Sequence, residues 1–340
     1  MTIFLTGGNG FIGSVVARSL AAAGHRLVCL LRDTSRVERL DGVPFTRARG
    51  DVRDRDSLRA GMAGTDATIH LAAPGAWEPE DPARLAAVVE GGTRNVLDVA
   101  ADRPGHRVVV VSSAAAIAAS RRPIVFDERT AFAVPDRTLH YAFAKHRAEL
   151  AAHAAHARGV PVVIVNPAEV YGPGDTALVT AGSLIDFATS TPVFVCRGGT
   201  SVVHVDDVAT GIVAALERGQ PGERYILGGD NLEIRRMAEL VLAWSGRRRP
   251  IVTLPGGALR LAARTAVALH VPLPFNPHVV PYATCYWFVD NAKARRELSV
   301  SFRGATETIG ATLDWLEQTD RIPQRRPRKA SASAKATADK

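Results

Sequence analysis

The first 165 residues alternate short apolar runs with longer segments rich in alanine and leucine. Most of the apolar runs lack polar residues at alternate positions, which is typical of strands covered on both faces. We therefore predict strands at Thr2–Thr6, Arg26–Leu31, Pro44–Arg49, Ala67–Leu71, Arg107–Ser112 and Pro161–Val165. The intervening segments predict helices at Gly10–Ala23, Asp54–Met62, Pro82–Ala101 and Leu139–Ala157. This alternation indicates an α/β fold, a doubly wound parallel sheet with right-handed crossovers.

The chain changes in texture after Asn166, where proline and glycine become more frequent and the periodic segments shorter. We predict a strand end and a helix at Val202–Arg218, a strand at Tyr225–Leu227, and helices at Glu233–Ser245 and Gly256–Leu269. The expected domains are a first one at 1–166, to which 202–228 return, and a smaller, discontinuous one at 167–201 and 229–320. In such a fold a ligand binds at the carboxyl ends of the strands, in the cleft below the smaller domain.

The net charge of the 340 residues is +8, yet the segment 321–340 alone holds seven lysines and arginines against one aspartate. The rest of the chain is therefore almost neutral, which argues against nucleic-acid binding. The segment has Ile322 as its one large aliphatic residue, too little apolar surface to fold. We predict a disordered basic tail that is solvated or in weak contact with an anionic surface.

Three scattered cysteines, Cys29, Cys196 and Cys285, form no CxxC pair. Their spacing argues against a disulfide scaffold and a structural zinc site, so we predict no metal and a reducing compartment. No apolar run approaches the length of a membrane span. The first strand begins at Thr2 with no charged or apolar leader before it, so we expect a cytoplasmic protein.

A glycine-rich sequence, Gly-Gly-Asn-Gly-Phe-Ile-Gly, directly follows the strand Thr2–Thr6. Gly7 and Gly10 permit a tight turn and a close approach of the backbone to a pyrophosphate, and Gly13 lets the next helix lie against the sheet. Free N–H groups at the start of that helix attract phosphate. Glycine-rich turns are common, but this one connects a strand to an amphipathic helix. We therefore predict dinucleotide binding.

The end of the second predicted strand selects between the two nicotinamide cofactors. An acidic residue there binds the ribose 2′-hydroxyl of NAD, whereas an arginine suits the 2′-phosphate of NADP. Arg32 comes first, Asp33 follows, and Arg36 and Arg39 lie just beyond. A guanidinium can clamp a phosphate and stack on adenine, so the order favours NADP(H). NAD(H) remains open, with Asp33 on the ribose.

Tyr141 and Lys145 lie four residues apart on a predicted helix, and so on one face of it. A nearby ammonium and a positively charged nicotinamide ring favour the phenolate, which brings a tyrosine into range for general acid–base catalysis. Ser112 and Ser113 lie at the carboxyl end of a strand, where a hydroxyl can hydrogen-bond a substrate oxygen as charge develops. The order glycine turn, serine, Tyr-x-x-x-Lys predicts an active site.

Together these motifs resemble the extended short-chain dehydrogenase/reductases, or NAD-dependent epimerase/dehydratase family, over nearly all of residues 1–318. The motifs are TGGNGFIG at 6–13, GDVRD at 50–54, HLAAP at 70–74, SSAAA at 112–116, YAFAK at 141–145, NPAEVYGPGD at 166–175 and HVDDVA at 204–209. The stretch YWFVDNAKARRELSV at 286–300, followed by a helix through Trp315, resembles the dihydroflavonol-4-reductase-like and hopanoid-associated sugar-epimerase branch. The resemblance implies a Rossmann-type domain, a smaller substrate domain, and a possible homodimer formed through the helices Pro82–Ala101 and Leu139–Ala157.

The resemblance also implies roles for individual residues. Tyr141 would donate and accept the proton, Lys145 would hold the nicotinamide ribose, and Ser113, or its neighbour Ser112, would orient the substrate oxygen. The implied cofactor contacts are Gly7, Gly10, Phe11, Ile12, Gly13, Arg32, Asp51, Val52, Ala72, Ala73, Tyr141, Lys145 and Pro167. For His204–Asp207 it implies a structural link between domains, because polar residues at such a junction usually satisfy one another.

Three functions remain open. The first is an NADP(H)-dependent oxidoreductase acting on a small carbonyl or alcohol, and the apolar residues Trp77, Phe132 and Phe143 favour a less polar substrate. The second is an NAD-dependent nucleotide-sugar epimerase or dehydratase. It is weakened because segment 88–95 has valine in place of the asparagine of many relatives, and because Ile117–Ala118 replace a tyrosine that sugar-nucleotide members carry. The third is a non-catalytic NADP-binding redox sensor, although such relatives typically lose the tyrosine or the lysine.

Overall fold

The computed structural model describes residues 1–74, 81–269 and 277–325. Its central layer is a parallel sheet of seven strands in the order β11-β7-β5-β4-β1-β2-β3. The strands are β1 (Thr2–Thr6), β2 (Arg26–Leu31), β3 (Thr46–Arg49), β4 (Ala67–His70), β5 (Arg107–Val111), β7 (Val162–Pro167) and β11 (Arg224–Leu227). The sheet grows outward from β1 in one direction and from β4 in the other. The switch point of the doubly wound fold therefore lies beside the glycine turn that follows β1.

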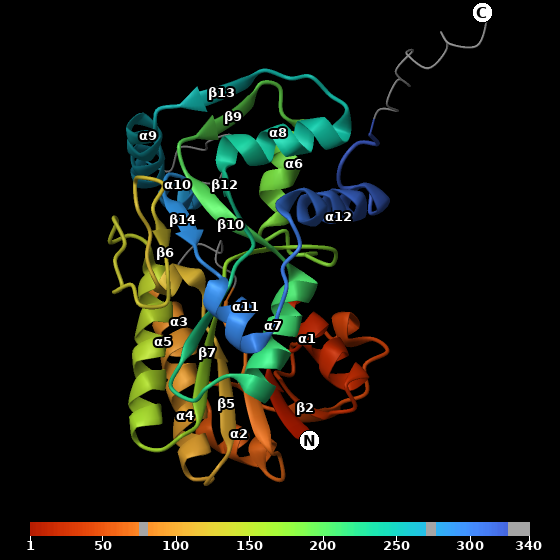
Figure 1. Ribbon diagram of the computed structural model, residues 1–340, viewed down its shortest axis with the longest axis vertical. Coiled ribbons are helices and arrows are strands. Elements are labelled where there is room, and N and C mark those ends of the chain that lie inside the picture. The colour runs from red at the N-terminus through yellow and green to blue at the C-terminus, as the bar shows by residue number, and fades with distance from the viewer. Residues whose placement is uncertain (75–80, 270–276, 326–340) are drawn as a thin grey trace, which may run out of the picture.

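Helices cover both faces of this sheet, as Figure 1 shows around β5 and β7. One face packs against α1 (Phe11–Ala22), α7 (Val205–Arg218) and α11 (Ala292–Leu298). The other face packs against α2 (Arg55–Met62), α4 (Gly92–Ala101) and α5 (His140–Ala157). Each face buries its own apolar cluster, which explains why the strands have no polar alternation.

The remaining elements gather at the carboxyl ends of the central strands (Figure 1). A second sheet has the order β12-β10-β14-β6, with β8 also paired to β10, and β13 and β9 form a parallel pair. These strands are β6 (Val125–Phe126), β8 (Glu169–Tyr171), β9 (Val193–Cys196), β10 (Gly199–His204), β12 (Asp230–Glu233), β13 (Ile251–Leu254) and β14 (Tyr286–Val289). The helices are α6 (Ala181–Thr189), α8 (Ile234–Ser245), α9 (Gly256–Leu269), α10 (Val280–Ala283) and α12 (Ala305–Gln318).

The doubly wound parallel fold predicted from the sequence is confirmed, with element ends shifted by one or two residues. The helix expected at Pro82–Ala101 is continuous but contains a π-helical segment, Ala86–Gly91, between α3 (Pro82–Leu85) and α4. Residues 202–204 belong to β10 in the second sheet, and α7 and β11 join the central layer. The domain limits drawn from the sequence stay a prediction.

The predicted tail needs a correction at its start. Ile322 is buried in the apolar cluster formed with α6, α8 and α12, and Arg325 pairs with Asp314 at 2.9 Å and with Glu317 at 3.3 Å. Residues 321–325 are therefore folded, because a single aliphatic side chain and an ion pair attach them to α12. The rest of the predicted tail lies outside the described residues.

Candidate functional site

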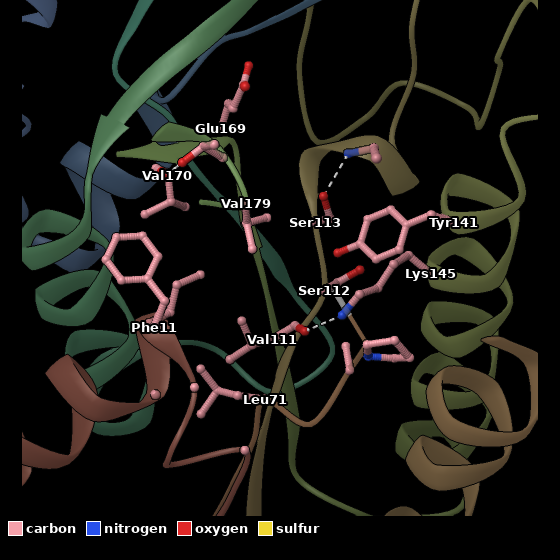
Figure 2. Close-up of a pocket in the computed structure, with 18 of the residues that line it drawn as sticks. Phe11, Leu71, Val111, Ser112, Ser113, Tyr141, Lys145, Glu169, Val170 and Val179 are labelled. Atoms are coloured by element: carbon pink, nitrogen blue, oxygen red, sulfur yellow. Dashed lines mark hydrogen bonds between the residues drawn. The ribbon is translucent and has the colours of Figure 1, made fainter. Parts of the chain in front are cut away.

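A cavity of about 690 Å³ opens between the carboxyl ends of the central strands and the second sheet. The glycine turn, the ends of β2, β4 and β5, and α5 contribute its lower wall, while β8, β10, α8 and the segment 279–287 contribute the upper wall. Figure 2 shows Tyr141 and Lys145 projecting from α5 toward Ser112 and Ser113, with Phe11, Val170 and Val179 across the cavity. The position at the switch point is where this class of fold binds ligands.

The glycine turn leaves room that no other residue type would leave. Gly7 has φ +71°, and a Cβ atom on it would lie 2.8 Å from the backbone of Leu71 and Ala72. A Cβ atom on Gly13 would lie 2.1 Å from the carbonyl oxygen of Gly7. Helix α1 begins after Gly10 with no side-chain cap and no acidic residue in its first turn, so its positive end faces the cavity uncompensated. This cradle fits a pyrophosphate.

The end of β2 presents arginines to the cavity. Arg32 and Arg39 line the cavity, whereas Asp33 does not and instead faces Arg49 at 3.8 Å on the surface. Arg39 donates a hydrogen bond to the backbone of Asn9 at 3.5 Å and another to the hydroxyl of Thr176 beyond β8. Among the described residues at this edge, the charge facing the cavity is therefore positive near Arg32, which favours an anionic group on the ligand.

Asp51 and Val52 form the wall next to Arg32. The Arg53 guanidinium binds Asp51 through Nε at 2.9 Å and Nη2 at 2.8 Å and lowers the pKa of the Asp51 carboxyl. A Cβ atom on Gly92 of α4 would lie 2.7 Å from the Val52 side chain, so the start of α4 packs tightly behind this wall. The arrangement fixes a carboxylate beside an apolar surface, a combination that is typical of small-molecule sites.

Lys145 is buried and donates a hydrogen bond to the carbonyl oxygen of Val111 at 3.0 Å, at the end of β5. Burial lowers the pKa of Lys145 to about 8, and the Glu149 carboxylate opposes that shift. The ammonium lies 5.8 Å from the centre of the Tyr141 ring. Ser113 accepts a hydrogen bond from the Ala115 N–H at 3.2 Å, while the Ser112 side chain is buried beneath it. Figure 2 shows all four side chains on one side of the cavity.

A buried carboxylate stands one turn behind Lys145. Glu149 accepts hydrogen bonds from Asn166 and from Arg224 (3.3 Å), and Arg224 is held in turn by the carbonyl oxygens of Glu128 and Thr130. Burial raises the pKa of Glu149, while Arg224 and Asn166 favour its ionised form. Asn166 also donates to the carbonyl oxygen of Ser113 at 2.9 Å. One network therefore supports both the lysine and the serine.

We expect Glu149→Gln to move the basic limb of the pH–rate profile to lower pH. The amide keeps an acceptor for Asn166 but removes the negative charge that raises the pKa of Lys145, so the ammonium is lost at lower pH. Steady-state turnover across a pH series measures the shift. Glu239→Gln on α8, where the carboxylate pairs with Arg235 and Arg236 at the surface, serves as the matched control. An unchanged limb in a folded Glu149→Gln protein would disprove the coupling.

A second buried chain of hydrogen bonds ties the glycine turn to α4. Thr6 lies 2.7 Å from His70 Nδ1, His70 Nε2 lies 3.1 Å from the Thr93 hydroxyl, and Thr93 donates to the carbonyl oxygen of Val89 at 2.6 Å. Burial, with the Lys145 ammonium adding to it, lowers the pKa of His70 to about 3, so the imidazole is neutral. The Ala72 N–H completes the chain by donating to Thr6 at 3.3 Å. These bonds hold the ends of β1 and β4, where the strand order reverses, against the helix that contains Val89 and Thr93.

The upper part of the cavity is mostly apolar. Its wall is formed by Val170, Val179, Phe187, Ile234, Met237, Val279, Tyr282 and Trp287. Within it stands one carboxyl, Glu169, which accepts a hydrogen bond from the Tyr171 hydroxyl at 2.8 Å and whose pKa is raised by burial. Its side chain points away from Tyr141 (Figure 2). The upper chamber therefore suits an apolar ligand body that meets one polar cluster.

Most of the residues assigned from the sequence share this cavity. Ser112 and all the assigned catalytic and cofactor residues except Pro167 line it. Pro167 is buried in β7, and Ala168 and Glu169, the next two residues, reach the cavity instead. Phe132 and Phe143 do not line it; their rings pack edge to face, and Phe132 also stacks on His146 of α5. Trp77 lies outside the described residues. The roles assigned to these residues stay predictions.

The segment His204–Asp207 lies away from the cavity lining. His204 accepts a hydrogen bond from the Asp206 N–H at 3.1 Å at the start of α7, and Arg303 pairs with Asp206 and Asp207 at 3.3 Å each. Burial lowers the pKa of His204, with Arg303 adding to the effect. The segment joins α7 to the loop before α12.

Sequence reasoning did not single out Glu149, Glu169 or Thr93. Glu149 had a signal, since it follows Lys145 by four residues on the same helix face. Glu169 follows β7 by two residues, but its place in an apolar chamber depends on β10 and α8, which pack from far along the chain. Thr93 gave no signal, because it lies on α4 and its partner His70 lies on β4, far away in the sequence.

Comparison with known proteins decides the family. The family model for the NAD dependent epimerase/dehydratase family matches residues 3–228. The chain belongs to this family. The family match and the named relatives together indicate an NAD(P)-dependent oxidoreductase or epimerase of the extended short-chain dehydrogenase/reductase type.

Several of its relatives carry reductase names. It is 30% identical to a "putative dihydroflavonol 4-reductase" of Synechocystis sp., over 92% of this chain and 94% of that one. It is 32% identical to the "4-hydroxy-2-methyl-3-oxo-4-farnesyl-3,4-dihydroquinoline-1-oxide ketoreductase" of Stigmatella aurantiaca, over 89% and 92%. The crystal structure of gox2253 is similar with a TM-score of 0.82 and 30% identity, over 95% and 99%.

No helix among residues 1–74, 81–269 and 277–325 is long and apolar enough to cross a bilayer. Within the same ranges no three histidine, cysteine, aspartate or glutamate side chains converge as metal ligands do.

Proposed function

We propose that this family member is an NADP(H)-dependent reductase of a carbonyl group on a predominantly apolar small molecule. The observation that carries the proposal is the convergence of the glycine cradle, Tyr141 and Lys145 on one cavity whose upper chamber is apolar. The reductase names of the relatives, one of them for a farnesyl-bearing ketone, support the direction of the reaction and the character of the substrate.

NADP(H) is favoured over NAD(H) because of the residues at the end of β2. Arg32 lines the cavity while Asp33 is turned to Arg49, so of these two residues at the end of β2 the arginine is the one available to the adenosine ribose of a dinucleotide. A guanidinium binds a phosphate through charge-assisted hydrogen bonds, whereas a carboxylate would repel it.

Tyr141, Ser113 and Lys145 have separate roles in the proposed reaction. When bound, the reduced nicotinamide supplies the hydride. Tyr141 Oη donates the proton to the carbonyl oxygen, and Ser113 orients that oxygen through a hydrogen bond. Lys145, held by the Val111 carbonyl, stabilises the phenolate that remains, since an adjacent ammonium lowers the pKa of a phenol. Water is excluded by the apolar chamber above.

The first test of the proposal is titration of the full chain with NADPH and with NADH, followed by a panel of apolar ketones and aldehydes monitored through the absorbance of the reduced nicotinamide. We expect NADPH to bind more tightly and to be consumed. Cofactor that stays bound with no net consumption on addition of a nucleotide sugar would favour an epimerase instead. Binding with no turnover on any carbonyl would favour a sensor.

We expect Arg32→Ala to weaken NADPH binding by about tenfold to a hundredfold and to leave NADH binding nearly unchanged. The reason is that the variant removes the partner of the 2′-phosphate, a group that NADH lacks. The ratio of the two dissociation constants measures this. Arg26→Ala, at the exposed opposite end of β2, is the matched control. Equal losses for both cofactors would place Arg32 elsewhere on the dinucleotide and would remove the basis for the NADP preference.

A further inference from the structure

Large apolar side chains are exposed at the end of the molecule formed by β9, β13 and α9. Leu261 is 65% exposed and Leu269 72% exposed, both on α9. Phe194 and Val252 are exposed partners across β9 and β13, and β13 leads into α9 (Figure 1). We call α9 with these two strand residues the α9 surface. Scattered exposed apolar residues are normal, but a group of this kind on adjoining elements indicates a binding surface.

The outer face of helix α9 is mixed rather than uniformly polar. Its buried residues are Ala263 and Ala266, which define the side that faces the protein. With 3.6 residues per turn, the opposite side carries Leu261, Thr265 and Ala268, with Arg264 on one edge and Leu269 on the other. The helix therefore buries small residues and exposes two leucines beside an arginine.

The segment that contains this helix is rich in positive charge. Residues 240–289 hold five arginines and no aspartate or glutamate. Two of them, Arg260 and Arg264, belong to α9, and the other three precede β13. The described acid that interacts with Arg264 is Asp136, and Asp136 is paired with Arg121 at 3.5 Å.

The α9 surface adjoins the candidate active site. Helix α10 packs against α9, and its residues Tyr282 and Ala283, with Val279 just before it, line the apolar upper chamber. A surface on which α9 rests would therefore lie next to the wall of the chamber.

We propose that the α9 surface docks this protein on the surface of an anionic phospholipid bilayer. An exposed apolar face flanked by arginines, on a segment that holds no acid of its own, is the pattern of a helix that lies in the interface between headgroups and acyl chains. Arginines attract anionic headgroups, and Leu261 and Leu269 enter the apolar layer. The absence of a spanning helix from the described residues fits a protein that rests on one leaflet. The docking does not depend on the proposed reaction.

The experiment is cosedimentation of the full chain with vesicles of phosphatidylcholine alone and of phosphatidylcholine mixed with phosphatidylglycerol. We expect binding to the anionic vesicles that falls as salt rises, since exposed charges are screened. The double variant Leu261→Ser/Leu269→Ser should bind at least about tenfold more weakly, because it removes the transfer free energy of two leucines that enter the apolar layer of the bilayer. Leu150→Ser on α5, which is 54% exposed, is the matched control and should bind as wild type.

A site-specific probe distinguishes α9 from the basic tail. The three native cysteines are buried, so Leu261→Cys and Leu150→Cys each supply one accessible thiol for a polarity-sensitive dye. We expect the emission to move to shorter wavelength on anionic vesicles only for Leu261→Cys. A chain ending at Arg325 should retain this shift.

Three results would overturn the proposal. They are a lack of binding to anionic vesicles, binding that the α9 variants leave unchanged but removal of residues 326–340 abolishes, and a dimer in solution that the double variant dissociates. The last result would identify a second copy of the chain as the occupant of the α9 surface.

Discussion

Tyr141→Phe should lower the turnover of a carbonyl substrate by about a hundredfold to ten-thousandfold and leave the binding of NADPH nearly unchanged. The substitution keeps the packing of the ring against Leu85, Val89 and α5. It removes the hydroxyl that α5 directs toward the serines. The dissociation constant of NADPH and the single-turnover rate, measured separately, distinguish loss of the proton donor from loss of the cofactor site.

Lys145→Met tests the other member of the Tyr141–Lys145 pair. The lysine is buried and donates a hydrogen bond to Val111, and methionine is an apolar side chain of similar length that fits the space, while Glu149 keeps Arg224 as its partner. If the ammonium stabilises the phenolate, turnover falls as in Tyr141→Phe, and the double variant is hardly slower than either single one. Turnover within a few-fold of wild type in a folded Tyr141→Phe protein would remove Tyr141 from the mechanism and contradict the proposed function.

The elements that could be predicted from the sequence are those whose pattern is local. The strands of the central sheet are apolar throughout because they are covered on both faces, and Gly256–Leu269 matches α9 residue for residue. The short strands of the second sheet could not be predicted. β6 has two residues, and its pairing of Val125 with Phe288 joins positions far apart in the chain. Such strands form because tertiary contacts position them.

The candidate site divides in the same way. Gly7, Gly13, Tyr141 and Lys145 are readable because a turn or a helix fixes their spacing. The apolar chamber is not readable, because α8 and the segment 279–287 converge only in the folded chain. Phe132 and Phe143 were therefore the wrong source for the prediction of an apolar substrate, although the chamber itself is apolar.

The glycine cradle carries the second large effect. Gly13→Ala should weaken the binding of NADPH and NADH alike by at least about tenfold. An added Cβ atom would lie 2.1 Å from the Gly7 carbonyl oxygen, a backbone atom that cannot move without shifting the turn. Overpacking of this kind costs about 1–3 kcal/mol, and the turn that shifts is the one that faces the pyrophosphate. Isothermal titration with each cofactor measures the loss.

Gly310→Ala provides the matched control, because it makes the same change within helix α12, where an added Cβ atom meets nothing within 4 Å. That variant should bind both cofactors as wild type and melt at the same temperature or slightly higher, since alanine restricts the unfolded chain more than glycine does. A Gly13→Ala protein that is folded and binds both cofactors with wild-type affinity would show that the diphosphate does not rest on this turn. Because Arg32 and Tyr141 line the same cavity as this turn, that result would also remove the main support for their cofactor contacts.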